Sequence, residues 1–171
     1  MIYRVVRLGH PALRAKSVPV DPKRIQNKPF QKLIDDLIAT MRAYGGVGIA
    51  APQIGLAERI FCVECRKNKR YPGMPHIPVY TVINPKLTIV DPTPVGMMEG
   101  CLSVPDMRAQ VYRAKSVRIE GLDRKGNRIS NVYNGFHARI LQHEFDHING
   151  KVYLDRVKPA DRHTLCYCEY L

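Results

Sequence analysis

Apolar side chains recur every three to four residues between Phe30 and Tyr44. The positions are Leu33, Ile34, Leu37, Ile38 and Met41. This spacing puts them on one face of an α-helix, because successive helical residues turn by about 100°. The pair Gly45–Gly46 follows and is typical of a helix end. The pattern therefore predicts an amphipathic helix over Phe30–Tyr44.

Strand patterns dominate most of the remaining chain. Runs rich in β-branched and aromatic residues, or with alternating apolar and polar positions, are typical of β-strands. These segments are Met1–Val6, Glu58–Cys65, Val79–Val90 with a break at Asn84–Pro85, a hairpin over Val111–Tyr133, and the alternating tail Cys166–Leu171. The hairpin turn is predicted over Leu122–Asn127, where Gly126 suits a positive φ angle. Arg70–Pro78 is rich in proline and is predicted to be a loop.

A second helix is predicted from Asn134–Gly135 to Asn149–Gly150, where Gly150 suits the residue after a helix cap. One face of it carries residues spaced by four, three and four positions: Phe136, Ile140, His143 and His147. Two helices among many strands predict an α+β fold. The 171 residues are 45% hydrophobic, which is enough for a single domain, residues 1–171, with its own core.

The second helix contains the pattern H-E-x-x-H, from His143 to His147. Two histidines four positions apart lie on the same side of a helix, where they can bind one small cation. Glu144 lies beside that face, where its carboxylate can exchange a proton with water. This combination is typical of a hydrolytic metal site, and Asp146 is a candidate for orienting a group behind the ligands. The alternative is an exposed helix that carries these residues by chance.

A catalytic metal of this kind needs a third protein ligand. The other cysteines and histidines are Cys62, Cys65, Cys101, Cys166, Cys168, His10, His76, His137 and His163. Cys62 and Cys65 have the spacing of half a zinc site, which Cys166 and Cys168 would have to complete. Their apolar surroundings favour the simpler interpretation of a buried strand.

Three blocks of the chain resemble the motifs of the peptide deformylase family. They are Gly46–Gln53 for G-Φ-G-Φ-A-A-x-Q, Glu99–Ser103 for E-G-C-Φ-S, and Gln142–His147 for Q-H-E-Φ-D-H, where Φ is apolar. The blocks stand in the family's order, and the resemblance extends from His10 to about Val157. It implies antiparallel β-sheets around a central metal-binding helix, with one further N-terminal helix.

The resemblance also implies a reaction. The implied metal ligands are Cys101, His143 and His147. They are expected to hold one divalent ion, Fe²⁺ in vivo, with Zn²⁺, Ni²⁺ or Co²⁺ able to replace it in purified protein. Glu144 is expected to move the proton, while the side chain of Gln53 and the backbone N–H of Leu102 stabilise the oxyanion. The implied activity is removal of the formyl group from the N-terminal N-formylmethionine of nascent polypeptides, with release of formate.

Five further residues are expected to bind the substrate. The close backbone approach allowed by Gly46 and Gly48 suits β-like pairing with a peptide. By the resemblance, Phe136 and Ile140 line a pocket for the methionine side chain, and Arg108 contacts the peptide backbone or its carboxyl end. The alternatives are a flexible turn at the glycines, core packing of Phe136 and Ile140, and a plain surface charge at Arg108.

The chain carries 27 Lys and Arg against 15 Asp and Glu, a net charge of +12. Such an excess attracts polyanions. Because a deformylase meets nascent chains at the ribosome, ribosomal RNA is the expected partner, through basic stretches such as residues 1–30 and Arg66–Arg70. The alternative is a solvated basic surface without a partner. No motif of a nucleic-acid-binding fold occurs, so sequence-specific binding is not expected.

Composition also bears on location. No run of 18 apolar residues occurs, so no membrane span is expected. Five irregularly spaced cysteines favour a reducing compartment, and no leader segment precedes Met1–Val6. The bacterial cytoplasm is the expected location, although a processed organellar form would have the same features.

The sequence leaves three rival functions open. A zinc endopeptidase shares H-E-x-x-H but takes its third ligand from beyond the helix, where His163 and Glu169 are available. The others are a basic, ribosome-associated binding protein with a vestigial site, and an enzyme for a different formylated or acylated amine. The chain departs from some members of the family it resembles in the basic, proline-rich stretch Arg66–Pro78, in the end Pro159–Leu171, and in Arg139, where some relatives have an apolar residue.

Overall fold

The computed structural model describes residues 1–66 and 73–168. Its strands are β1 (Gly48–Ala50), β2 (Ile60–Cys65), β3 (Ile77–Cys101), β4 (Val104–Leu122), β5 (Arg128–Asn134) and β6 (Cys166–Tyr167). Its helices are α1 (Lys28–Ala43), α2 (Gly135–His147) and the short 3-10 helices η1 (Pro11–Leu13), η2 (Pro22–Arg24), η3 (Ala51–Ile54), η4 (Tyr153–Arg156) and η5 (Pro159–Thr164). The strands of the described ranges form one antiparallel sheet, ordered β1-β2-β3-β4-β5, with β6 beside β4. The predicted α+β class is confirmed.

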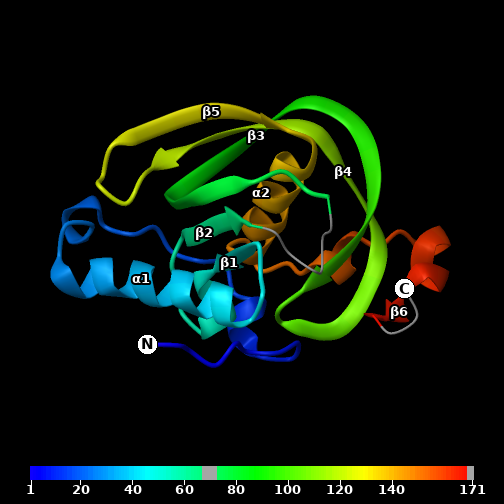
Figure 1. Cartoon of the computed structure of the whole chain (residues 1–171), viewed down its shortest axis with the longest axis horizontal. Helices are drawn as coiled ribbons and strands as arrows, with labels where there is room; N and C mark the ends of the chain where they lie inside the picture. Colours follow the sequence, from blue (N-terminus) through cyan, green and yellow to red (C-terminus); the bar gives the residue numbers. More distant parts are fainter. Residues whose placement is uncertain (67–72, 169–171) are drawn as a thin grey trace.

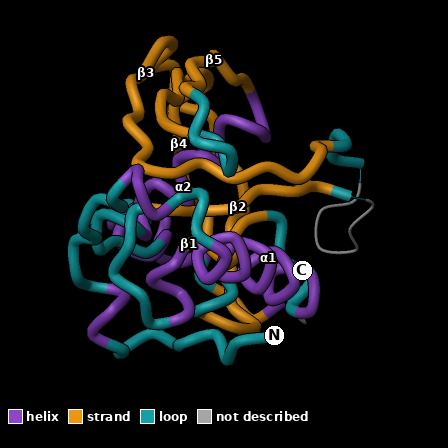
Figure 2. Tube along the Cα trace, turned by 90° about the vertical axis from the view of Figure 1, so that its left-hand side faces the viewer, coloured by secondary structure: helices purple, strands orange, loops and turns teal. Residues whose placement is uncertain are grey.

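The helix α2 lies inside the curve of the sheet, and it contacts each of β1 to β5 (Figure 1). The helix α1 lies outside, against β1 and β2. Seen from the side, parts of β3, β4 and β5 extend away from the layer that contains α1 (Figure 2). None of the described helices has the length and apolar character needed to cross a membrane.

The strand β2 separates two apolar layers. All of its residues are buried. Cys62 belongs to the cluster that includes Leu37 of α1, whereas Phe61 packs in the cluster that includes Leu141 of α2. Because alternate side chains of a strand point to opposite faces, a strand covered on both sides is mostly apolar, and the one charged residue of β2, Glu64, is paired with Arg42. This confirms the interpretation of Cys62 as part of a buried strand.

Several predicted elements are confirmed and others are wrong in extent. Both predicted helices form, and Gly45 and Gly150 adopt positive φ angles after them. The hairpin turn forms with Gly126 at a φ of 85°. However, residues 1–6 lie in no strand, and β3 does not stop at Asn84–Pro85. Asn84 has a φ of 53° at a register shift between Ile83 and Lys86, and β4 pairs with β3 on both sides of this irregularity.

The predicted loop and tail are described only in part. Residues 77–78 of the predicted loop begin β3 instead, and residues 67–72, with most of the basic cluster at Arg66–Arg70, lie outside the described residues. The alternating tail supplies β6, which pairs with Met107 and Arg108. Residues 169–171 also lie outside the described residues.

Candidate metal centre and active site

The end of β3 and the helix α2 bring three potential metal ligands together. Cys101 is the last residue of β3 and pairs with Val104 across a tight turn. His143 and His147 lie one turn apart on α2. A sulfur or ring nitrogen of each lies within 4.8 Å of the other two, and Cys101 Sγ is 3.2 Å from His147 Nε2. Among the described residues, no other group of His, Cys, Asp or Glu side chains has this geometry.

The donor set fits a divalent metal. One sulfur and two imidazole nitrogens suit Zn²⁺ and Fe²⁺ alike. His143 Nδ1 lies 3.1 Å from Glu99 Oε2, and an Nδ1–H bond to this carboxylate leaves Nε2 for a metal. His147 is fully buried, and its Nδ1 has no hydrogen-bond partner among the described residues. The cluster supports a single metal ion per chain.

The pKa values of the ligands agree with this assignment. Burial alone would raise the pKa of Cys101, but His147 and His143 lower it well below the ordinary value. Burial alone would lower the pKa of His143, but Cys101 and Glu99 raise it well above the ordinary value. These directions favour a thiolate beside a protonated imidazole. A divalent cation replaces that proton when it binds the same atoms.

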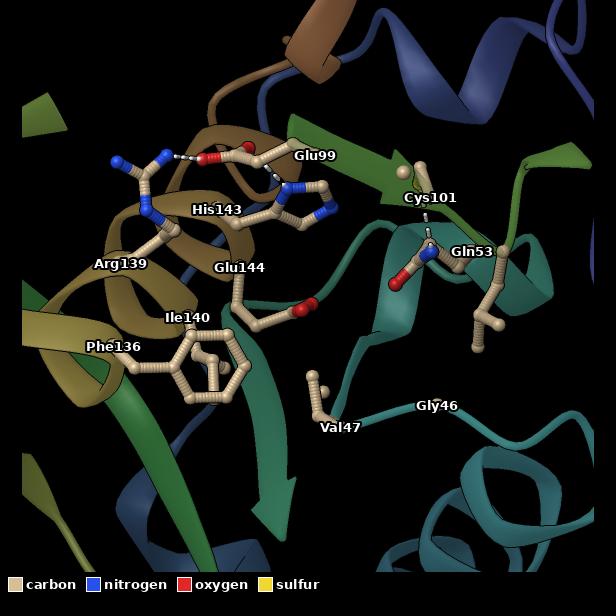
Figure 3. A pocket seen from close by; sticks show the side chains of 13 residues that line it. Gly46, Val47, Gln53, Glu99, Cys101, Phe136, Arg139, Ile140, His143 and Glu144 are labelled. Atoms are coloured by element: carbon tan, nitrogen blue, oxygen red, sulfur yellow. Dashed lines mark hydrogen bonds and ion pairs between the residues drawn. The ribbon is translucent and has the colours of Figure 1, made fainter. Parts of the chain in front are cut away.

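Glu144 projects into the pocket beside the ligands (Figure 3). It is 3% exposed, and burial raises its pKa to about 7, although His143 and His147 act in the opposite direction. Its Oε2 has no hydrogen-bond partner among the described residues. A carboxyl group with a pKa near neutral is suited to both accept and donate a proton. A Cβ added at Gly48 would lie 2.7 Å from Glu144 Cδ, so Gly48 makes room for this carboxylate.

Gln53 is positioned from several sides. Its Oε1 accepts a hydrogen bond from the backbone N–H of Ala50 at 2.9 Å, which turns Nε2 toward Cys101 Sγ at 3.5 Å and Ser103 Oγ at 3.4 Å. The backbone of residues 6–8 holds both Gln53 and Ser103 in place. Val6 N–H donates to the carbonyl of Gln53, and Leu8 N–H donates to that of Ser103. The amide N–H groups of Gln53 therefore point to the ligand cluster, as an oxyanion donor requires.

A pocket of about 490 Å³, partly open to solvent, adjoins the cluster. Its lining residues are Gly46, Val47, Gly48, Gln53, Glu99, Gly100, Cys101, Leu102, Phe136, Arg139, Ile140, His143 and Glu144. Phe136 and Ile140 lie on one side of Glu144, and His143 with Glu99 on the other (Figure 3). The structure thus brings together most of the site residues predicted from the sequence.

Two predicted residues do not line the pocket, and one of the two third ligands considered for a peptidase lies away from the cluster. His147 is fully buried and lies behind the lining, although it belongs to the Cys–His–His cluster. Arg108 is partly buried on β4, opposite Gly100 and beside β6. His163 is exposed on η5, where its Nδ1 bonds the carbonyl of Ala160, and it is not part of the cluster. Glu169 lies outside the described residues.

A buried network of ion pairs behind the ligands was not predicted. Arg113 donates to both oxygens of Glu99, at 2.7 and 2.9 Å, and to Asp146 at 2.8 Å. Asp146 also accepts from Arg156, at 3.0 and 2.5 Å. Asp146 therefore bonds groups behind the candidate ligands, as predicted, and these groups are two arginines. Burial would raise the pKa of Glu99, but Arg113 and His143 hold it well below the usual range. The only sequence signal was the position of Glu99 in the block around Cys101.

Comparisons with known proteins agree on one family. A family model described as polypeptide deformylase matches residues 2–163. "Peptide deformylase" of Leptospira biflexa is 41% identical over 158 residues, covering 92% of this chain and 88% of the relative. "Peptide deformylase 2" of Nostoc sp. is 42% identical over 166 residues, covering 97% and 91%. The Met-Ala-Ser-bound class I type b peptide deformylase from Acinetobacter baumannii superposes with a TM-score of 0.89 at 37% identity, covering 92% and 99%. The chain belongs to the polypeptide deformylase family, whose members are hydrolases.

Proposed function

We propose that this protein hydrolyses the formyl group from the N-terminal N-formylmethionine of nascent polypeptides and releases formate. The observation that carries the proposal is the buried cluster of Cys101, His143 and His147, with Glu144 beside it in one pocket. A relative of known structure binds Met-Ala-Ser, a peptide that begins with methionine. This supports a site for the N-terminus of a peptide chain.

The cluster is proposed to hold one divalent ion, Fe²⁺ in vivo, with Zn²⁺, Ni²⁺ or Co²⁺ as replacements in purified protein. When bound, such an ion supplies Lewis acidity, which makes water acidic near neutral pH and polarises a carbonyl group. The thiolate of Cys101 and the two imidazoles supply the ligand atoms. The hydrogen bond from His143 to Glu99 keeps the ring oriented for this role.

The pocket residues are proposed to position the substrate and to move one proton. Glu144 takes a proton from water on its carboxylate and delivers it to the departing amine nitrogen. Gln53 Nε2 and the backbone N–H of Leu102 donate to the formyl oxygen as it gains negative charge. Losing one such donor typically costs about 3 kcal/mol in the transition state.

Four residues are proposed to select the peptide. Phe136 and Ile140 pack against the methionine side chain, which excludes water from that side of the pocket. Gly46 and Gly48 allow the peptide backbone to approach closely. Arg108 on β4 pairs with Gly100 on the neighbouring strand β3, and it is proposed to contact the peptide beyond its first residue.

The proposed partners are formylated nascent chains and the ribosome. The net charge of +12 supports electrostatic attraction to ribosomal RNA. The relatives named above are bacterial, so the bacterial cytoplasm is the proposed location. Cosedimentation with ribosomes that weakens as salt increases would support docking, whereas cosedimentation that is absent at low salt would argue against it.

The deciding experiment is anaerobic formate release from formyl-Met-Ala-Ser with iron, nickel or zinc supplied. Rapid release by the wild type, lost in Glu144→Ala while the metal stays bound, is the expected result. A folded and metal-loaded protein that releases no formate with any of the metals would refute the proposed activity. Release from other formylated amines but not from this peptide would favour a different substrate.

A further inference from the structure

The pocket contains one buried cation that the proposed reaction does not use. Arg139 lies on α2, one turn before His143, and is 5% exposed. It lines the pocket with apolar neighbours, among them Phe136 and Ile140 (Figure 3). A buried ion pair is weak support for stability, because an apolar side chain of similar size is often as good or better. The presence of Arg139 therefore requires another explanation.

The guanidinium of Arg139 bonds the carboxylate that orients a metal ligand. Its Nη1 donates to Glu99 Oε1 at 2.5 Å. Arg113 donates to both oxygens of the same carboxylate, and His143 Nδ1 lies at Oε2. Glu99 thus accepts bonds from three side chains. Any rotation of its carboxylate that improves one contact must weaken another.

Arg139 also bonds the backbone of both long strands. Nη1 lies 3.1 Å from the carbonyl oxygen of Val111 on β4, and Nη2 lies 2.5 Å from that of Val95 on β3. Val95 belongs to an exposed stretch of β3, residues 92–96. One planar side chain from α2 therefore connects the ligand helix with β3, β4 and Glu99 at once. Only a guanidinium has several donors fixed in one plane, and the single ammonium of a lysine does not.

We propose that Arg139 is a positioning residue for the metal centre. It holds the Glu99 carboxylate in the one orientation that accepts the Nδ1–H of His143, and so fixes the direction of the His143 Nε2 lone pair. It acts on the metal site through Glu99 and is not itself a ligand of the cluster. The inference rests on the metal site of the proposed function and is independent of which amide the enzyme cleaves.

The test uses two variants of this residue and one matched control. Arg139→Met removes the donors and keeps an apolar chain of similar length, while Glu99 stays paired with Arg113. Arg139→Lys keeps the charge but cannot reach Glu99 and both carbonyls together. Arg156→Gln is the control, because it removes guanidinium bonds to Asp146 at the outer end of the same network without touching Glu99. The readouts are the rate of Zn²⁺ release to a chelator and the visible absorption spectrum of the Co²⁺-loaded protein.

Removing the partner of a metal-ligating histidine typically costs 10- to 100-fold in metal affinity. Since Arg139 acts one step further out, Arg139→Met is expected to release Zn²⁺ about tenfold faster and to shift the Co²⁺ spectrum. Arg139→Lys is expected to fall between it and the wild type, and Arg156→Gln to match the wild type.

A folded Arg139→Met protein with unchanged release and spectrum would overturn the proposal. If Arg139→Met does not fold, Arg139→Lys serves as the test. A wild-type rate of Zn²⁺ release in Arg139→Lys would then overturn the proposal equally. Equal acceleration in Arg156→Gln would assign the effect to general loosening of the network and would also overturn it. Formate release by the wild type is measured in parallel, so failure of the proposed function is recognised separately.

Discussion

Gly48→Ala tests the geometry around the proposed proton acceptor directly. A Cβ at this position would lie 2.7 Å from Glu144 Cδ and 2.9 Å from Cγ, and closer still to Oε1. Both residues are buried, so the Glu144 carboxylate has to leave its place beside the metal ligands. The metal ligands themselves are not among the nearest atoms. The substitution should therefore separate catalysis from metal binding.

The magnitude follows from the role of the displaced group. General acid–base catalysis contributes about 10²–10⁴-fold, so Gly48→Ala is expected to lose a factor in this range from kcat. Overpacking of a buried site typically costs about 1–3 kcal/mol, which should lower the free energy of unfolding. Metal content per chain should remain that of the wild type.

The same substitution in a Glu144→Ala background provides the refuting result. There the colliding atoms are gone, and Gly48 has no positive φ angle that would strain an alanine. Adding Gly48→Ala should then change the residual kcat by less than about twofold, and should stabilise the fold by about 0.4–1 kcal/mol through the unfolded state. Formate-release kinetics and thermal unfolding of the four proteins measure both quantities. An equal loss of kcat in both backgrounds would refute the collision, and a loss confined to KM would mean that the substitution acts only through the peptide contact proposed for Gly48.

Four further outcomes are expected. Added Zn²⁺ should raise the Tm of the metal-free wild type but not that of Cys101→Ala, and an equal rise in both would contradict the ligand assignment. Phe136→Ala should raise KM for formyl-Met-Ala-Ser more than for formyl-Ala-Ala-Ser, and equal effects would indicate plain core packing. The bidentate bond from Arg42 lowers the pKa of Glu64, so its stabilisation is present above about pH 4.3 and fades as pH falls through the lowered pKa. Urea unfolding should therefore show that Glu64→Gln destabilises at pH 7 and converges with the wild type in acid. Iron-loaded enzyme should lose activity in air and keep it with a reductant present, and full activity after prolonged aeration would argue against iron.

The chemistry of the site could be predicted because part of it is local. His143 and His147 lie on one side of α2 simply because they are four residues apart. Cys101 is different, since no spacing rule brings it to α2, and only the resemblance selected it among five cysteines. Its place depends on the turn between β3 and β4, which is a property of the folded sheet.

The charged network could not be predicted, because partner choice depends on strand register. Glu99 pairs in register with Ala109, and Arg113 with Val95, so the two charged residues meet only diagonally across the sheet. A register shifted by one residue would turn their side chains to opposite faces. The close approach of Gly48 to Glu144 could not be predicted either, because 96 positions separate the two residues in the sequence. A substrate-binding role was predicted for Gly48. In the structure, the group that a Cβ at this position would meet first is the carboxylate of Glu144.

The helix α2 has to satisfy two demands that conflict. Ala138, Leu141 and Ile148 belong to the apolar core, whereas Arg139 and Asp146 bury charges against β3 and β4. Burial of each charge costs free energy, and ion pairing only offsets this cost. The charged side of α2 is therefore not expected to add to the stability of the fold. Its ion pairs are better explained by the need to hold His143 in one orientation. If so, stability and metal retention should respond in opposite directions: an apolar residue at Arg139 should leave the Tm unchanged or raise it, while it accelerates metal release. A parallel fall in both quantities would mean that the network serves the fold and not the metal centre.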